Sequence, residues 1–267
     1  MKKIATTLTF ASALLAAPLA VNAAPVLYNW DYTVTTEFVP STTQWNSATQ
    51  GTQENTPTVI SWGARGGDYT DLSAGPLDAR SAITISGTPA TGTAITNGAI
   101  EDTSIVSHYN NILDDRFKTL TRTSLVTTLT LAANPGGGAP VGSPFSKTFN
   151  VEFIETQNQT PCFADSESVC DDIFVLGLSN LLQSFTYEGV TYNVEIIGEL
   201  GVLPDSACIE AGAPLGCFGL QTREAAITTA PFAFRITAQI PEPGILALLG
   251  IGLAGVGFMS RRRSSAV

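Results

Sequence analysis

The sequence is poor in histidine and in basic residues. It has one histidine, His108, and 13 lysines and arginines against 23 aspartates and glutamates in 267 residues. Five basic residues lie in the two terminal segments, which leaves 8 basic and 22 acidic residues between them and a net charge near −14. Nucleic-acid phosphates need a basic face, so this charge argues against a nucleic-acid partner. It favours solubility outside the cell.

The sequence also lacks the motifs of several common enzymes and metal proteins. It has no GxSxG elbow, no HExxH helix, no EF-hand spacing and no repeat of fixed period. We predict no cofactor and no metal ligands. The alternative to this prediction is a bound calcium ion, for which Asp171-Asp172 and the stretch from Asp68 to Asp71 are the best candidate sites. The simpler interpretation is that both stretches are solvated acidic turns.

The N-terminal segment, MKKIATTLTFASALLAAPLAVNA, has the pattern of a secretory signal peptide. Lys2 and Lys3 form a positive start, an apolar run follows through Leu19, and Val21 and Ala23 are small residues before a cleavage point. The apolar run is too short for a first transmembrane helix. We therefore predict a cleavable signal helix at residues 1–23 and export from the cytoplasm.

The C-terminal segment, residues 241–267, predicts a short membrane stop. Pro241 and Pro243 mark the boundary of the folded body, because proline breaks a helix interior. The apolar run at residues 244–259 would form a helix of about 24 Å, shorter than a hydrocarbon core of roughly 30 Å. The arginine cluster Arg261, Arg262 and Arg263 would stay on the cytoplasmic side.

These residues carry a resemblance. Pro241-Glu242-Pro243, the glycine-rich apolar helix and the terminal arginines, in that order, resemble the PEP-CTERM sorting signal of Gram-negative bacteria. The resemblance implies transient contact with the inner membrane and cleavage near the motif by an exosortase. It also implies delivery to the cell surface or to an extracellular matrix that contains exopolysaccharide.

The four cysteines lie in the exported body, at positions 162, 170, 208 and 217. Export to an oxidising compartment favours disulfides, and loop closure is easiest between near neighbours. We predict Cys162 paired with Cys170 and Cys208 paired with Cys217. Zinc is disfavoured, because both spacings are longer than a zinc knuckle needs and only one histidine is available.

The body, residues 24–240, predicts an all-β fold. Apolar residues alternate with polar ones at 81–87, 125–132, 148–155, 191–198 and 232–240, and turns rich in glycine and proline separate these runs. Such spacing favours an antiparallel β-sandwich, jelly-roll-like or immunoglobulin-like, over a barrel. Helical periodicity appears only in the terminal segments, and residues 179–185 suit a short helix or a strand.

A second resemblance lies around the histidine. Ser107-His108-Tyr109-Asn110 is similar to the Thr-His-x-Asn hallmark of the THxN family of PEP-CTERM proteins, with serine in place of threonine. The stretches ISWGARGG at 60–67, FNVEFIETQNQTPC at 149–162 and CDDIFVL at 170–176 agree with that family. The resemblance implies a cell-surface protein and supplies no reaction.

Catalysis by this motif is the less favoured interpretation. Histidine titrates near neutral pH, but a nucleophile needs a base bonded to it and a third group that orients the base. The simpler expectation is that Ser107, His108 and Asn110 bond loop backbone and pin a connection between strands. Glycoside hydrolysis needs two carboxyl groups close to each other. Glu152 and Glu155 are expected on opposite faces of their strand, so they are poorly placed to act as such a pair.

We therefore expect a structural or adhesive protein of the surface matrix or biofilm, without enzyme activity. The alternative is a protein that binds carbohydrate or hydrolyses it. Aromatic residues in the first third of the body suit either a sugar-binding face or the core, and for tryptophan the core is more common. They are Tyr28, Trp30, Tyr32, Trp45, Trp62 and Tyr69.

Overall fold

The computed structural model describes residues 26–135, 140–141, 144–156, 158, 160–177, 182–198 and 200–238. The chain divides into two units, one at residues 26–239 and one made of residues 1–25 and 240–267. The predicted signal peptide, apolar C-terminal helix and sorting residues lie outside the described residues. No helix in the described ranges is long and apolar enough to cross a membrane.

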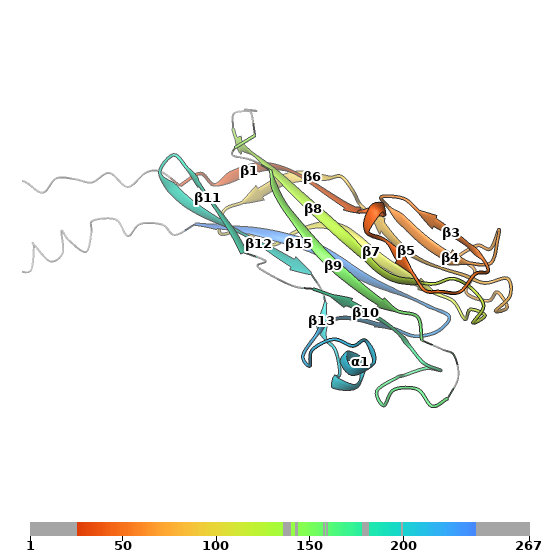
Figure 1. The fold of residues 1–267 in the computed structure, drawn as a ribbon. Helices are drawn as coiled ribbons and strands as arrows, with labels where there is room; N and C mark the ends of the chain where they lie inside the picture. The colour runs from red at the N-terminus through yellow and green to blue at the C-terminus, as the bar shows by residue number, and fades with distance from the viewer. Residues whose placement is uncertain are drawn as a thin grey trace, which may run out of the picture. The chain divides into compact units, whose positions relative to one another are not determined.

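Fifteen strands in the described residues form two antiparallel sheets (Figure 1). The first sheet has the order β13-β14-β10-β9-β8-β1-β6, and β2 pairs with β8. Its strands are β1 Asn29–Phe38, β2 Gln44–Trp45, β6 Ala90–Ile95, β8 Leu120–Asn134, β9 Phe145–Ile154, β10 Asp172–Leu176, β13 Gly201–Val202 and β14 Phe218–Thr222.

The second sheet has the order β11-β12-β15-β7-β5-β4-β3. Its strands are β3 Thr52–Asn55, β4 Val59–Gly63, β5 Arg80–Ser86, β7 Glu101–Asn110, β11 Leu182–Tyr187, β12 Val190–Gly198 and β15 Ala226–Ala238. The all-β prediction is confirmed, and two sheets that share one core are what a β-sandwich requires. The jelly-roll-like or immunoglobulin-like order stays a prediction.

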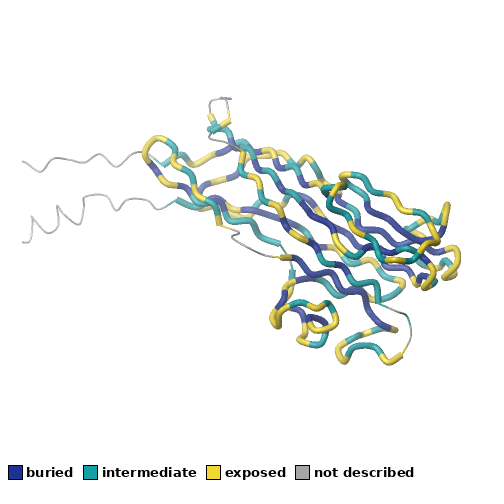
Figure 2. Tube along the Cα trace, in the orientation of Figure 1, coloured by how far each residue is buried: buried dark blue, intermediate teal, exposed yellow. Residues whose placement is uncertain are grey.

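Side-chain alternation explains why these segments are strands. In β9, Phe149, Val151 and Phe153 are buried, whereas Glu152 is partly exposed and pairs with Arg122 on β8. Figure 2 shows the same alternation of buried and exposed residues along neighbouring strands. The five strands predicted from the sequence are present as β5, β8, β9, β12 and β15. Residues 182–185 lie in β11, which settles the described part of the 179–185 run as strand.

The main hydrophobic core lies between the sheets. Phe38, Phe149 and Phe153 from the first sheet pack in one cluster with Trp62 and Ile83 from the second. Burying a large apolar side chain contributes roughly 1.5–3 kcal/mol relative to leaving it exposed. The facing apolar surfaces of the two sheets therefore hold them together.

A smaller apolar cluster lies beside β10. It holds the short helix α1, Asp205–Glu210, whose Ala207 and Cys208 pack with Ile173 and Val175 of β10. The sequence predicts helical periodicity of useful length only in the terminal segments, and α1 has only six residues. A six-residue helix is too short for a periodic pattern to be detected, and its N-cap, Pro204, makes no capping hydrogen bond through its side chain.

Both predicted disulfides are confirmed. Cys162 bonds Cys170, and Cys208 bonds Cys217, with sequence separations of 8 and 9 residues. Among the described residues no cysteine is free. The second disulfide closes the segment from Cys208, in α1, to Cys217. Because Cys208 is fully buried in the smaller cluster, this disulfide helps to hold α1 against β10.

Replacing Cys208 and Cys217 together by serine is expected to lower the free energy of unfolding by about 2–3 kcal/mol, with a further loss because buried Cys208 packs against apolar neighbours. Urea denaturation would measure the change. The matched control is the double serine variant of Cys162 and Cys170, which removes the disulfide of a loop of similar length. In that pair Cys162 is half-buried and Cys170 is buried, but the smaller apolar cluster is formed around Cys208 and Cys217. An equal loss in both variants would contradict the additional packing contribution.

Candidate functional site

Five polar side chains from different elements meet at one end of the body, between the sheets. We call them the buried polar centre: His108 and Asn110 of β7, Glu155 directly after β9, Asp172 at the start of β10, and Glu224 between β14 and β15. His108, Asn110 and Asp172 are at most 1% exposed. The four stretches that carry the second resemblance converge here, because Trp62 of the 60–67 stretch also stacks on His108.

His108 lies inside strand β7, so the expectation that its motif forms a loop is wrong. Val106, His108 and Asn110 are buried on one face of the strand; on the other face Ile105 is exposed, Ser107 is buried and Tyr109 is partly buried. Ser107 and His108 are successive strand residues and point to opposite faces of the sheet. They are not placed as a nucleophile and its base.

Aromatic rings enclose the imidazole of His108. Trp62 stacks on it with ring centroids 6.1 Å apart, and Phe153 meets it edge to face at 5.0 Å. Burial lowers the pKa of His108 to about 3, so the ring is neutral at pH 7. Its Nε2 atom lies 3.9 Å from Asp172 Oδ2, which is too long for a hydrogen bond.

The three carboxyl groups of the centre favour the protonated state. Burial, followed by repulsion from Glu224, raises the pKa of Glu155 to about 8. Burial also raises the pKa of Glu224 to about 8, against a hydrogen bond from Asn110 that lowers it. The pKa of Asp172 is raised well above its ordinary value by burial and then by Glu155 and Glu224. Carboxylic acids that repel one another in a low-dielectric interior retain protons.

Some atoms of the centre are bonded and some are not. Trp62 Nε1 donates to Glu155 Oε2 at 2.8 Å, the Thr156 amide donates to Asp172 Oδ1 at 2.8 Å, and Asn110 Nδ2 donates to the Thr222 carbonyl at 3.1 Å. Six buried atoms have no hydrogen-bond partner among the described residues: both ring nitrogens of His108, Asn110 Oδ1, Glu155 Oε1, Asp172 Oδ2 and Glu224 Oε2. Burying an unpaired polar atom costs on the order of 1–3 kcal/mol. The unpaired atoms of the buried polar centre therefore lower the free energy of unfolding of the protein.

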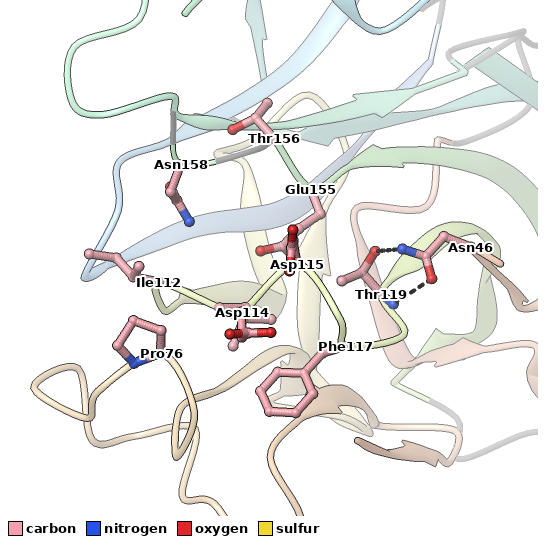
Figure 3. Close-up of a pocket in the computed structure, with 11 residues that line it drawn as sticks. Asn46, Pro76, Ile112, Asp114, Asp115, Phe117, Thr119, Glu155, Thr156 and Asn158 are labelled. Carbon is pink, nitrogen blue, oxygen red and sulfur yellow. Dashed lines mark hydrogen bonds between the residues drawn. The ribbon is translucent and has the colours of Figure 1, made fainter. Parts of the chain in front are cut away.

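A pocket of about 390 Å³ lies beside this centre and shares Glu155 with it. We call it the acidic pocket. Its walls come from the 111–119 segment and from the segment that follows β9, and Figure 3 shows Glu155 and Asp115 between those walls. Its lining residues are Asn46, Pro76, Ile112, Leu113, Asp114, Asp115, Phe117, Thr119, Glu155, Thr156 and Asn158.

The polar groups of the acidic pocket differ in how far they are already bonded. Asn46 Nδ2 donates to Thr119 Oγ1 at 2.9 Å, as Figure 3 shows, and Asp114 accepts from Arg116 Nε at 2.6 Å. The Arg116 bonds lower the pKa of Asp114. If the amide oxygen and nitrogen of Asn158 exchange places, the nitrogen donates to Glu224 Oε1 and to the Val169 carbonyl.

The acidic stretches predicted as alternatives for calcium are occupied by local hydrogen bonds. Asp171 accepts from the amides of Glu167 and Ser168 and from Gln221 Nε2. Asp68 accepts from the amide and the hydroxyl of Thr70. Within the described ranges, no group of three or more His, Cys, Asp and Glu side chains is placed to hold a metal ion.

The aromatic residues of the first third do not form one exposed face. Trp30, Tyr32 and Trp62 are buried in the core, and Trp45 packs against it. Tyr28 is 60% exposed, and Tyr69 meets Tyr109 edge to face at 5.1 Å. The interpretation as core is confirmed for both fully buried tryptophans.

Sequence reasoning did not identify Glu224 or Asp115 as members of a site. Glu224 joins the centre through the turn between β14 and β15, and Asp115 joins the pocket through the loop after β7. Each is one acidic residue among many in an acidic chain. The sequence placed Glu155 and Glu152 on opposite faces of their strand, and in the structure Glu155 bonds Trp62 whereas Glu152 pairs with Arg122.

The comparisons with known proteins concern the C-terminus. Residues 239–263 match the family described as the PEP-CTERM protein-sorting motif. The match covers Pro241, Glu242, Pro243 and the three arginines, so the predicted sorting signal is confirmed. No curated protein matches the chain. The motif indicates an exported protein that is sorted to the cell surface and processed by an exosortase.

Proposed function

We propose that the exported body is a structural or adhesive component of an extracellular matrix or biofilm that contains exopolysaccharide, and that it is not an enzyme. The sorting motif at residues 239–263 carries this proposal, because it indicates delivery to the cell surface. A body near −14 in charge, closed by two disulfides, suits an extracellular setting.

Membership in the THxN family belongs to the same proposal. Its support is the position of His108 in β7, which contacts one residue of each of the other three similar stretches, namely Trp62, Phe153 and Asp172. A shared role in the protein interior would explain why these stretches occur together in one sequence. In this proposal the motif stabilises one arrangement of the two sheets.

Changing Pro241, Glu242 and Pro243 together to alanine is expected to leave full-length precursor in the inner membrane, because the exosortase would no longer recognise the chain. Intact mass of the membrane, surface and medium fractions measures this. The natural sequence should give a mass ending near Pro241 that rises by about four hydrogens on reduction of its two disulfides. Glu37→Ala, on an exposed position of β1, is the control.

A mature mass that retains the three arginines would contradict processing and would make the protein membrane-tethered. The matrix role has a separate test, which is the amount of exopolysaccharide retained by cells that lack the protein. Unchanged retention, adhesion and biofilm mass would contradict the structural role while leaving the sorting result intact.

A carbohydrate-active hydrolase is the second candidate. The observation that favours it is the acidic pocket, where Asp114, Asp115 and Glu155 gather. A protonated Glu155 beside an ionised aspartate is the pattern of an acid with its partner. However, one Glu155 oxygen is bonded to Trp62 and the other is buried, so neither is open to a glycosidic oxygen. Release of reducing ends from host polysaccharide would establish the enzyme.

A further inference from the structure

We propose that the outer edge of β6 is a self-association surface, at which two copies of the protein pair antiparallel and continue their first sheets into each other. The inference goes beyond the proposed matrix role and does not depend on it, because a matrix component can also act as a monomer. It rests on the position of β6 in its sheet, on the uncharged sequence around it, and on the net charge of the body.

β6 is an open strand at the end of the first sheet, beside β1 (Figure 1). Among the described strands it pairs with β1 alone, in a continuous register from Ala90 to Ile95. Four of its six residues are exposed, and the side chain of Ile95 is 50% exposed. The backbone N–H and C=O groups of β6 that do not face β1 point outward, where they can pair with another strand.

The other edges of the two sheets have features that protect a sheet edge from such pairing. β13, at the opposite edge of the first sheet, has only two residues. β3, at one edge of the second sheet, contains Glu54, and its Asn55 is bonded to Pro40 and Thr43. β11, at the other edge, ends at a turn that carries Glu188. Short strands and charged side chains are common protection for an edge, and β6 has neither.

The sequence around β6 is uncharged, although the body is strongly acidic. No aspartate, glutamate, lysine or arginine occurs between Arg80 and Glu101. On the neighbouring strand, Asp31 already accepts hydrogen bonds from Thr93 and Asn134. With a net charge near −14, two bodies repel each other over most of their surfaces, and the repulsion is weakest where the surface is uncharged. A basic partner would instead be attracted to the acidic surfaces. The charge distribution therefore favours a second copy of this chain as the occupant.

Antiparallel pairing of β6 with itself also satisfies the symmetry of a dimer. A two-fold axis near the centre of the strand places the same groups of both copies against each other. The side chains of Thr91 and Thr93 stand perpendicular to the sheet, so they leave the backbone edge open. Six residues span roughly 20 Å, which gives a small interface. We therefore expect a weak dimer, with a dissociation constant on the order of 100 µM.

Sedimentation velocity of the mature protein, purified as its host exports it, measures this association over concentrations of about 10 µM to 1 mM. The dimer fraction is expected to rise with protein concentration. It should rise further when salt is added, because salt screens the repulsion between two acidic bodies. Amide hydrogen exchange at the same concentrations should show added protection in β6 and unchanged protection in β11.

Thr91→Lys is expected to abolish the dimer at these concentrations. The substitution places a charge from each copy in one short interface, which gives the edge the protection that it lacks. Thr91→Val is the matched control, because valine keeps the β-branched shape without a charge, and it should associate as the natural protein does. Thr186→Lys makes the same change at an exposed position of β11 and should also leave the association unaltered.

A protein that stays monomeric at every concentration would overturn the inference. A dimer that survives Thr91→Lys, or that is lost in Thr186→Lys instead, would place the interface elsewhere. A dimer that weakens as salt rises would indicate attraction between opposite charges and would exclude pairing of uncharged edges. If circular dichroism shows that Thr91→Lys does not fold, the exchange measurement on the natural protein decides, and unchanged protection of β6 in the dimer would overturn the inference.

Discussion

The protein is expected to be more stable at pH 5 than at pH 8. Glu155 and Glu224 have pKa values of about 8 in the folded chain against an ordinary 4.5, and the pKa of Asp172 is also raised. Between these limits the folded state holds protons that the unfolded state has lost. Their stabilising contribution is complete below about pH 4.5 and is lost as the pH rises through about 8.

His108 acts in the opposite direction over part of this range. Burial lowers its pKa from 6.5 to about 3, so below pH 6.5 the unfolded state binds a proton that the folded state does not. One histidine offsets one carboxyl group, which leaves at least one net proton on the folded side between about pH 4.5 and 8. Each such proton changes the unfolding free energy by about 1.4 kcal/mol per pH unit.

Urea denaturation at pH 5, 6.5 and 8 would measure this slope. Asp171 is adjacent to Asp172 of the centre, and its pKa is lowered from the ordinary value of 3.8. Its contribution to stability is therefore lost only below about pH 4, outside the range from pH 5 to pH 8. Glu155→Gln and Glu224→Gln each remove one titrating group and should flatten the profile. Glu37→Gln changes the same charge at an exposed site and should leave the slope unaltered. A protein equally stable at pH 5 and pH 8 would contradict the protonated centre.

The strands and the disulfides were predictable because their signals are local. Period-two alternation in 148–155 placed Phe149, Val151 and Phe153 on the buried face, and spacing paired each cysteine with its neighbour. Those inferences need only a few consecutive residues or a short loop. The same local pattern also separated Glu152, which pairs with Arg122, from Glu155, which bonds Trp62.

The buried polar centre was not predictable, because its members come together through strand order. β7 lies in the second sheet and β10 in the first, so His108 and Asp172 meet only when the sheets pack face to face. A histidine flanked by serine and asparagine suggests a polar loop, and the hydrophobic alternation that continues through it is weak. Strand order in each sheet and the packing of the two sheets are not encoded in any single segment.

Trp62→Phe is expected to lower the free energy of unfolding by more than the smaller volume of the phenylalanine side chain explains. The substitution retains an aromatic ring against His108 and Phe153 but removes the indole N–H that bonds Glu155. Both carboxyl oxygens of Glu155 would then lack a hydrogen-bond partner within the described part of the chain. An unsatisfied buried group costs about 1–3 kcal/mol, to which the lost indole volume adds.

Trp30→Phe is the matched control. Trp30 is equally buried, and its indole bonds the hydroxyl of Thr96 at 2.9 Å, a neutral group that also donates to the Leu27 carbonyl. Its loss leaves no unpaired carboxyl group, so the change in unfolding free energy should be smaller. Urea denaturation of both variants at pH 7 measures the difference, and equal losses would contradict the importance of the Trp62 bond.

Combining Trp62→Phe with Glu155→Leu should recover much of the loss, although each change removes a polar group from the same bond. Replacing both partners of a buried hydrogen bond by apolar groups can be nearly neutral, because no desolvated donor or acceptor remains. Leucine would also remove the repulsion between Glu155 and its neighbours Glu224 and Asp172. If the double variant is instead less stable than Trp62→Phe alone, Glu155 stabilises the fold through contacts other than Trp62. The centre would then be a structural network rather than a polar region retained at a cost in stability.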